Sequence, residues 1–193
     1  MSGFGPEELL ECYRRGIFPM ADNREAHGFY LMDPEHRAIF PIEDFRPSRS
    51  MRKFARNTVL KVTRNAAFPQ VIAACAELRP ETWISHGIEW LYGQLHAQGD
   101  AHSVEVYDGD ELVGGLYGVT QGGAFFGESM FSTRTNASKL ALMHLVAHLR
   151  EKGFTLLDAQ YLTPHLSSLG AVEITREDYQ SRLKDALQVD ARF

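Results

Sequence analysis

The sequence has few cysteines, no long apolar run and no export signal. Its two cysteines, Cys12 and Cys75, lack the spacing of a metal site, and we interpret both as free thiols. No apolar segment approaches the roughly 18 residues that a membrane-spanning helix needs. Residues 1–15 contain early acidic side chains and no apolar core of the kind found in signal peptides. These absences predict a cytoplasmic protein without membrane contact.

Acidic side chains are missing from one segment of an otherwise acidic chain, whose 193 residues carry a formal net charge of -5. Residues 46–64 hold no acid and seven basic side chains, namely Arg46, Arg49, Arg52, Lys53, Arg56, Lys61 and Arg64. The rest holds 13 basic and 25 acidic side chains, a net charge of -12. Such a patch suits an RNA stem held along one face. A solvated basic helix face without a partner is the alternative.

Periodicity and turn residues predict an alternation of helices and strands. Helices are expected over residues 48–56, 68–78, 87–98, 136–152 and 176–187. Residues 102–131 predict three strands joined by turns at 108–110 and 121–123. Further strands are expected over 59–64 and 155–162.

The N-terminal segment gives weaker signals. Residues 6–20 predict a short helix that Gly16 and Pro19 interrupt, and residues 21–48 predict a loop-rich stretch. We therefore expect a small, loop-rich N-terminal region over residues 1–47 and a main domain over 48–193. The order of elements in the main domain fits an α/β (α+β) fold of the GNAT acyltransferase class, with a mixed central sheet that opens a cleft between two strands.

Glycine is absent from the loop where that fold class would bind the pyrophosphate of coenzyme A. Acetyl-CoA enzymes present bare backbone N–H groups from a glycine-rich loop that leads into a helix. The corresponding loop here, residues 131–142, reads FSTRTNASKLAL. Coenzyme A is therefore not expected as a cofactor.

One carboxylate interrupts an apolar segment. Residues 123–132 read GAFFGESMFS, with Glu128 between Gly127 and Ser129. Burying an unpaired carboxylate costs several kcal/mol or shifts its pKa. Glu128 is therefore expected at an edge, in a pair, or in a functional role.

Short motifs along the chain resemble, in order and spacing, the leucyl/phenylalanyl-tRNA–protein transferases. They include YRRGIFPM, TWIS, FFGESMFS, NASK, LLDAQ and HLSSLGA, and the resemblance covers about residues 9 to 187. It implies transfer of Leu or Phe, with Met as a further candidate, from an aminoacyl-tRNA to the N-terminal Arg or Lys of an acceptor protein. It also implies marking for N-degron degradation and no metal or cofactor. We expect a monomer, although the sequence leaves the oligomeric state open. On this reading Arg49, Arg52, Lys53 and Arg56 contact the tRNA acceptor stem.

The resemblance implies that Asp158 and Gln160 are the catalytic pair, beside the reacting amine and ester. Their spacing of two puts both side chains on one face of a strand, where Asp158 can hold Gln160 and Gln160 can orient the amine. A purely structural hydrogen-bonded pair at the end of a strand is the alternative. Whether Asp158 acts as a base or only orients its neighbour stays open.

The resemblance places Glu128 in the substrate cleft, near the donor α-ammonium, the terminal ribose or the basic acceptor residue. A buried ion pair with Arg or Lys is the alternative. An apolar pocket for Leu or Phe is expected from Trp83, Tyr92, Leu116, Phe125, Met130 and Phe131. Ordinary core packing is the alternative for these side chains, and it suits Phe131 best. Ser129 and Asn136 are the polar candidates for substrate binding.

The chain departs from the family pattern at residues 31–34 and at residue 159, among other places. Leu31, Met32, Asp33 and Pro34 stand where the family commonly has W-W-S-P, which predicts weaker stacking on the terminal adenosine. Ala159 replaces the middle cysteine of D-C-Q, so no cysteine nucleophile is expected there.

Three histidines carry weaker signals. His144 and His148 are four residues apart on a predicted helix but lack a third metal ligand, so a non-metal role is expected. His165 is either an orienting residue or part of a structural turn. Two other functions stay open for the whole chain, a small-molecule N-acyltransferase of the GNAT class and a non-catalytic tRNA-binding module.

Overall fold

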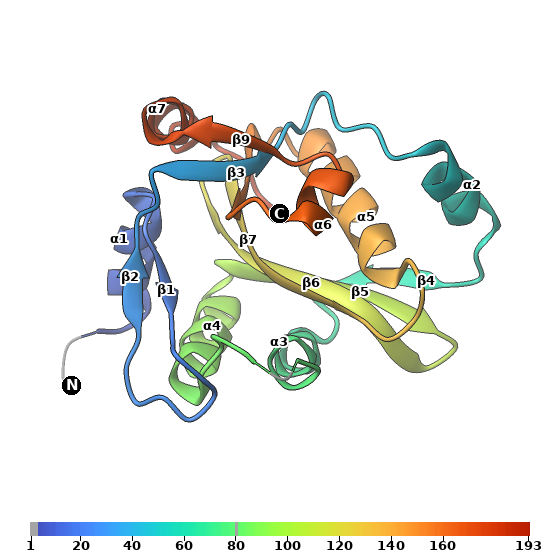
Figure 1. Ribbon diagram of the computed structural model, residues 1–193, viewed down its shortest axis with the longest axis horizontal. Coiled ribbons are helices and arrows are strands. Elements are labelled where there is room, and N and C mark those ends of the chain that lie inside the picture. Colours follow the sequence, from blue (N-terminus) through green and yellow to red (C-terminus); the bar gives the residue numbers. More distant parts are fainter. Residues whose placement is uncertain (1–3, 80) are drawn as a thin grey trace.

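A computed structural model describes residues 4–79 and 81–193, which form a seven-stranded sheet with helices on both faces (Figure 1). The strand order is β4-β5-β6-β7-β8-β3-β9. Their bounds are β3 (His36–Phe40), β4 (Lys61–Arg64), β5 (Ala101–Asp108), β6 (Glu111–Gln121), β7 (Ala124–Ser132), β8 (Leu156–Gln160) and β9 (Val172–Thr175). Only the β7–β8 pair in this sheet is parallel, so the expected mixed sheet is confirmed.

The helices separate into layers. Their bounds are α1 (Pro6–Arg14), α2 (Arg49–Asn57), α3 (Phe68–Glu77), α4 (His86–Gln98), α5 (Ala137–Glu151), α6 (Pro164–Ser168) and α7 (Arg176–Ala186). Helices α3 and α4 cover one face of the sheet, and α5 covers the other (Figure 1). The five helices predicted for the main domain are confirmed, and α6 forms where only a turn was expected. Within the described residues no helix has the length and apolar character needed to cross a bilayer.

The antiparallel meander β5-β6-β7 follows the turn signals. Gly109 and Gly122 have φ angles of 60° and 55°, the left-handed region that tight hairpin turns require. The β6–β7 register shifts between Tyr117 and Gly118, which marks a bulge. A Cβ atom at Gly118 would overlap the carbonyl oxygen of Phe126 and the ring of Phe125, so only glycine allows this approach of the two strands.

The N-terminal segment is more ordered than the sequence predicted. The short strands β1 (Phe18–Met20) and β2 (Tyr30–Met32) form a separate antiparallel pair. Strand β3 lies inside the main sheet, between β8 and β9. The prediction of a loop-rich stretch over 21–48 is therefore wrong for β2 and β3. A boundary at residue 47 would separate β3 from the sheet to which it belongs.

Candidate active site

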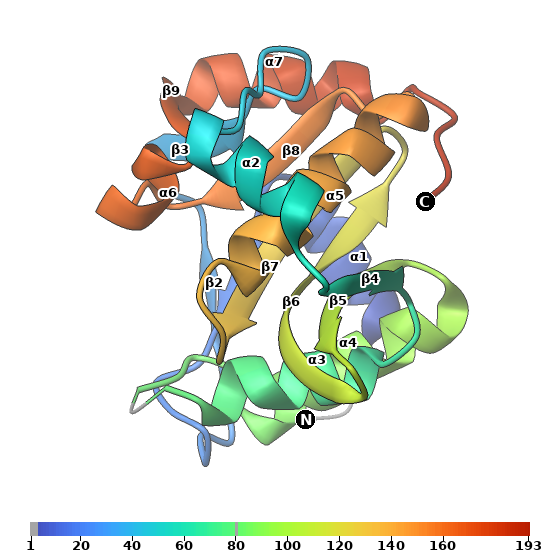
Figure 2. The same cartoon turned by 90° about the vertical axis from the view of Figure 1, so that its right-hand side faces the viewer.

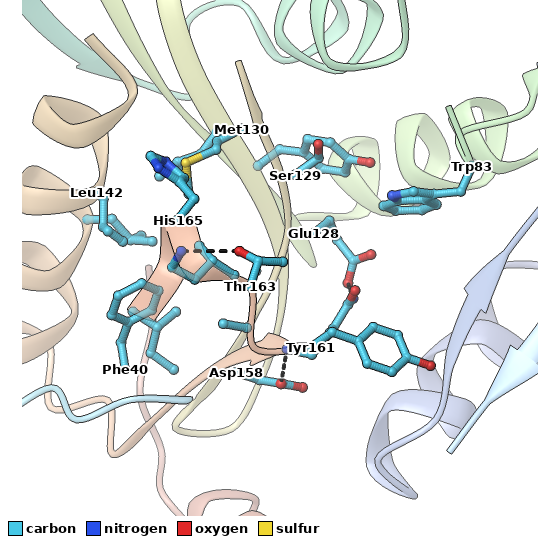
Figure 3. Close-up of a pocket in the computed structure, with 18 of the residues that line it drawn as sticks. Phe40, Trp83, Glu128, Ser129, Met130, Leu142, Asp158, Tyr161, Thr163 and His165 are labelled. Atoms are coloured by element: carbon cyan, nitrogen blue, oxygen red, sulfur yellow. Dashed lines mark hydrogen bonds between the residues drawn. The ribbon is translucent and has the colours of Figure 1, made fainter. Parts of the chain in front are cut away.

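Strands β7 and β8 separate halfway along, and a cavity of about 340 Å³ opens there (Figure 3). Their parallel pairing runs from Ala124 opposite Leu156 to Phe126 opposite Asp158 and then ends. Beyond that point β7 stays paired with β6, while β8 terminates at Gln160 in a left-handed conformation, φ 61°. Residues 127–130 and 158–161 line the cavity from the two separating strands.

Glu128 lies at this separation in a cluster of tyrosines. Tyr13 of α1 donates to Glu128 Oε1 at 2.7 Å, and Tyr92 of α4 donates to Oε2 at 2.7 Å. Gln160 Nε2 donates to Oε1 at 3.0 Å. No Arg or Lys of the described chain forms an ion pair with Glu128. The expected alternative of a buried ion pair is therefore wrong, since neutral donors surround this carboxylate.

The contacts around Glu128 leave a place for one more proton, and its burial favours the protonated form. The hydroxyl oxygens of Tyr13 and Tyr92 are also 2.6 Å apart, so three close oxygen contacts join the two phenols and the carboxylate. Two phenol protons fill only two of these contacts, and a proton on Glu128 fills the third. Burial raises the pKa of Glu128 to about 7, against the hydrogen bonds from the tyrosines and Gln160, which lower it, and the nearby charge of Asp158 raises it further.

Asp158 has a different environment, because its partner is a buried cation. Arg37 of β3 contacts both carboxylate oxygens, with Nε 2.9 Å from Oδ1 and Nη2 2.6 Å from Oδ2. Tyr179 of α7 donates to Oδ2 at 2.8 Å. The Arg37 guanidinium lies 4.6 Å from the ring centre of Phe18 and 4.5 Å from that of Tyr179. Burial opposes the charge of Arg37, but the charge and hydrogen bonds of Asp158 outweigh it and raise the pKa of Arg37.

Gln160 connects the two carboxylates. Its backbone N–H donates to Asp158 Oδ1 at 2.8 Å, while its side chain donates to Glu128. Asp158 is fully buried and accepts from Arg37, Tyr179 and Gln160. Asp158 therefore contacts Gln160 through the backbone, and the side chain of Gln160 bonds to Glu128.

The apolar wall of the cavity includes some of the predicted residues and omits others. Trp83, Leu116 and Met130 line it, together with Ser129. Leu142, Leu145 and Leu157 were not predicted and complete the wall on the α5 side. His165 also lines it.

Two predicted pocket residues lie behind the wall. Phe125 is fully buried, because β7 is still paired with β8 at that position, and its ring packs near Phe193. Tyr92 is also fully buried and reaches the site only through Glu128. Phe131 packs in the core on the side of α3 and α4. This agrees with ordinary core packing, the alternative that the sequence favoured for Phe131.

The remaining predicted residues lie away from this cavity. Asn136 occupies the N-cap position of α5 and lines a second cavity, between α2, α5 and α6. Arg49, Arg52, Lys53 and Arg56 are exposed on α2. Leu31 is 48% exposed on β2 and is outside the cavity wall.

Histidine and acidic residues form no metal-like cluster within residues 4–79 and 81–193. His148 instead packs edge-on against Phe193, with ring centres 4.6 Å apart.

Tyr13, Arg37 and Tyr179 belong to the site but were not predicted from the sequence. Each is fully or almost fully buried and each is a direct partner of Glu128 or Asp158. The sequence held one indication of Arg37, because a buried Asp158 requires a cation and Arg37 directly precedes the apolar residues 38–40 of β3. The sequence did not indicate Tyr13 or Tyr179 as site residues, because a tyrosine on an amphipathic helix usually packs against the core.

Comparison with known proteins gives consistent matches. Residues 39–184 match the family model described as leucyl/phenylalanyl-tRNA protein transferase, and residues 4–35 match the model of its N-terminal domain. A protein named leucyl/phenylalanyl-tRNA--protein transferase from Maricaulis maris (strain MCS10) is 55% identical over 100% of this chain and 91% of its own length. One of the same name from Hyphomonas neptunium (strain ATCC 15444) is 52% identical over 98% of this chain and 75% of its own.

A solved structure supports the fold alone. The structure titled "Crystal structure of FemX" aligns with a TM-score of 0.56 at 12% identity, over 86% of this chain and 66% of that chain. Together with the mixed sheet, this similarity confirms the expected GNAT-like fold.

Proposed function

The chain belongs to the leucyl/phenylalanyl-tRNA–protein transferase family, and from this premise we propose that it transfers Leu or Phe from aminoacyl-tRNA to the N-terminal Arg or Lys of acceptor proteins. One structural observation carries the proposal. The separation of β7 and β8 brings Glu128 and Gln160 into contact at an apolar cavity of about 340 Å³. An apolar cavity of this kind discriminates modestly between Leu, Phe and Met, so Met is a further candidate donor.

The reaction needs a neutral amine next to an ester. The amine nitrogen attacks the ester carbonyl carbon, an amide bond forms, the ester C–O bond breaks, and the ribose oxygen of the tRNA leaves with a proton. A free α-amine has a pKa of about 7.7 to 8.0 and is largely protonated at neutral pH. A group that accepts its proton inside the cavity therefore accelerates the attack.

Glu128 fits the role of proton acceptor better than Asp158 does. The ionised carboxylate of Glu128 lies in the cavity wall, and accepting a proton completes the three contacts with Tyr13 and Tyr92. Asp158 accepts hydrogen bonds from Arg37 and Tyr179. Its role is to position Gln160, whose backbone N–H it also binds. Gln160 then orients the amine through its side-chain oxygen.

The proposal extends to the biological role and the assembly. Addition of Leu or Phe to a basic N-terminus marks the acceptor for N-degron degradation in the cytoplasm. The cavity is formed within one chain, so we expect a monomer to be active.

The direct test is transfer of labelled Leu, Phe and Met from charged tRNA to a peptide that begins with Arg. The same peptide with an acetylated N-terminus is the matched control, because it lacks only the attacking amine. We expect transfer of Leu and Phe to the free peptide, none to the acetylated one, and a large loss of rate in Asp158→Asn. Binding of charged tRNA without transfer to either peptide would instead indicate a non-catalytic tRNA-binding protein.

A further inference from the structure

A second cavity of about 340 Å³ lies between the start of α2, the first half of α5 and the end of α6. Figure 2 shows α2 lying across α5, with α6 beside them. The polar wall of the second cavity includes Arg46 and Lys139, together with the hydroxyl groups of Ser50 and Ser167. No Asp or Glu is among the described residues that line it. The cavity therefore combines two cations and neutral donors without an opposing charge.

The two cations have no carboxylate partner within the described part of the chain. Arg46 donates to the backbone carbonyl oxygens of Glu43 and Phe45, at 2.7 and 3.0 Å, and forms no ion pair. Lys139 is half-buried and no described acidic side chain lies within 4 Å of its ammonium. An anionic ligand is the natural complement to such a pair.

The second cavity lies next to the first. Leu142 of α5 contributes to both walls. On α6, Leu166 lines the first cavity and the next residue, Ser167, lines the second. On its other side the second cavity borders α2, whose exposed cations are unpaired in the described structure. The basic helix α2 is thus followed by the cationic second cavity, and the second cavity is followed by the apolar first cavity.

An aminoacyl-tRNA has the same order of chemical groups. Its acceptor stem is a duplex, its 3′ end is a short single strand of phosphodiesters, and its last ribose carries the aminoacyl ester. We propose that the second cavity binds a phosphodiester of the single-stranded 3′ end of the donor tRNA, through Lys139 and Arg46. This inference rests on the proposed function, and it gives Asn136, which lines the same cavity, a place beside the donor strand.

Matched donors test the assignment. Phenylalanyl-adenosine has no phosphodiester, phenylalanylated CpCpA has only the single strand, and Phe-tRNA has the strand and the stem. Lys139→Gln should lower kcat/KM about tenfold or more with the last two donors, because it removes a charged hydrogen-bonding contact. It should leave phenylalanyl-adenosine unchanged. Lys152→Gln, an exposed change at the other end of α5, is the control and should not affect any donor.

A binding arm separates failure of this inference from failure of the proposed function. Binding of uncharged tRNA between 50 and 200 mM salt does not depend on transfer, and each lost single-strand phosphate contact lowers the salt slope by about 0.7. An unchanged slope in Lys139→Gln overturns the phosphodiester site whether or not transfer occurs. Equal loss with all three donors also overturns it, since Lys139 would then support the fold or the first cavity. If wild type shows no transfer but Lys139→Gln still lowers the salt slope of tRNA binding, the proposed function is overturned and the phosphodiester site is retained.

Discussion

Two buried carboxylates lie in one site, and their neighbours give them different chemistry. Asp158 has a cation and several donors, whereas Glu128 has two phenols and an amide. Two carboxyl groups in such different environments commonly serve as an orienting group and a proton-transferring group. The contrast at this site follows from Arg37, which contacts Asp158 and not Glu128.

The raised pKa of Glu128 predicts a specific pH dependence of stability. Its pKa is about 7 in the folded chain and near 4.3 in an unfolded one, so folding favours the protonated form. The stabilising contribution is complete below the unfolded value and is lost as the pH rises through about 7. We expect the difference in unfolding free energy between wild type and Glu128→Gln to change by up to about 3 kcal/mol between pH 4.5 and 8, with wild type losing stability relative to the variant.

Urea unfolding of both proteins at several pH values measures this difference. The glutamine side chain has the same shape and no titration in this range, so other titrating groups cancel. A pH-independent difference would show that the Glu128 carboxyl does not change protonation on folding. In the transfer reaction, both rates should rise as the acceptor amine loses its proton, and only the wild-type rate should show a further rise through about pH 7.

At the scale of the elements, the site depends on how β6 and β7 approach each other before β7 leaves β8. Gly118 lies opposite Gly127 and Tyr117 lies opposite Ser129, so Glu128 is the extra residue of the bulge and has no partner on β6. The close approach at Gly118 leaves no room for a side chain. This contact therefore fixes where β7 turns away from the parallel pairing.

We predict that Gly118→Ala displaces β7 and reduces both stability and transfer. The added Cβ meets backbone and an aromatic ring that is itself fully buried, so overpacking of about 1 to 3 kcal/mol is expected. Gly93→Ala is the control, because a Cβ at this position within α4 meets no atom within 4 Å. A helix-interior glycine to alanine change there should stabilise by about 0.5 to 1 kcal/mol. Thermal unfolding distinguishes the two, and equal effects would contradict the role of the bulge.

Local signals made much of this fold predictable. Turn glycines at 109 and 122 fixed the hairpins, and apolar periodicity fixed the long helices. Strand β3 was missed because its partners come from the far end of the chain, with Arg37 and Asp158 separated by 121 positions. For the same reason the sequence indicated Asp158, Gln160 and Glu128 as candidates but not the partners that distinguish them.

At the scale of the whole molecule, charge is divided between regions. The exposed cations of α2 lie at one end, and α1 and α7 lie at the other (Figure 1). Arg49, Arg52 and Lys53 form no ion pairs within the described residues, so their charge is available to a phosphate backbone. The body that carries them is acidic, which disfavours nucleic acid elsewhere on the surface.

We predict that replacing Arg49, Arg52 and Lys53 with Ala weakens tRNA binding and lowers its salt slope by about 2.7, or about 0.9 for each duplex phosphate contact. Transfer from phenylalanylated CpCpA should not change, because that donor has no stem. The control replaces Arg14, Arg15 and Lys184, three exposed cations at the other end. An equal loss in the control would indicate a response to net charge and contradict a stem site on α2.

The position of β3 has a consequence for how the chain is made. This strand pairs with β8 and β9, and it is synthesised long before them, because Arg37 and Asp158 are 121 positions apart. Until then its apolar residues Ala38, Ile39 and Phe40 have no sheet partner, a situation in which nascent chains engage chaperones. Arg37 reaches Asp158 only when β3 enters the sheet. The contact between Arg37 and Asp158 therefore forms only after β8 has been synthesised.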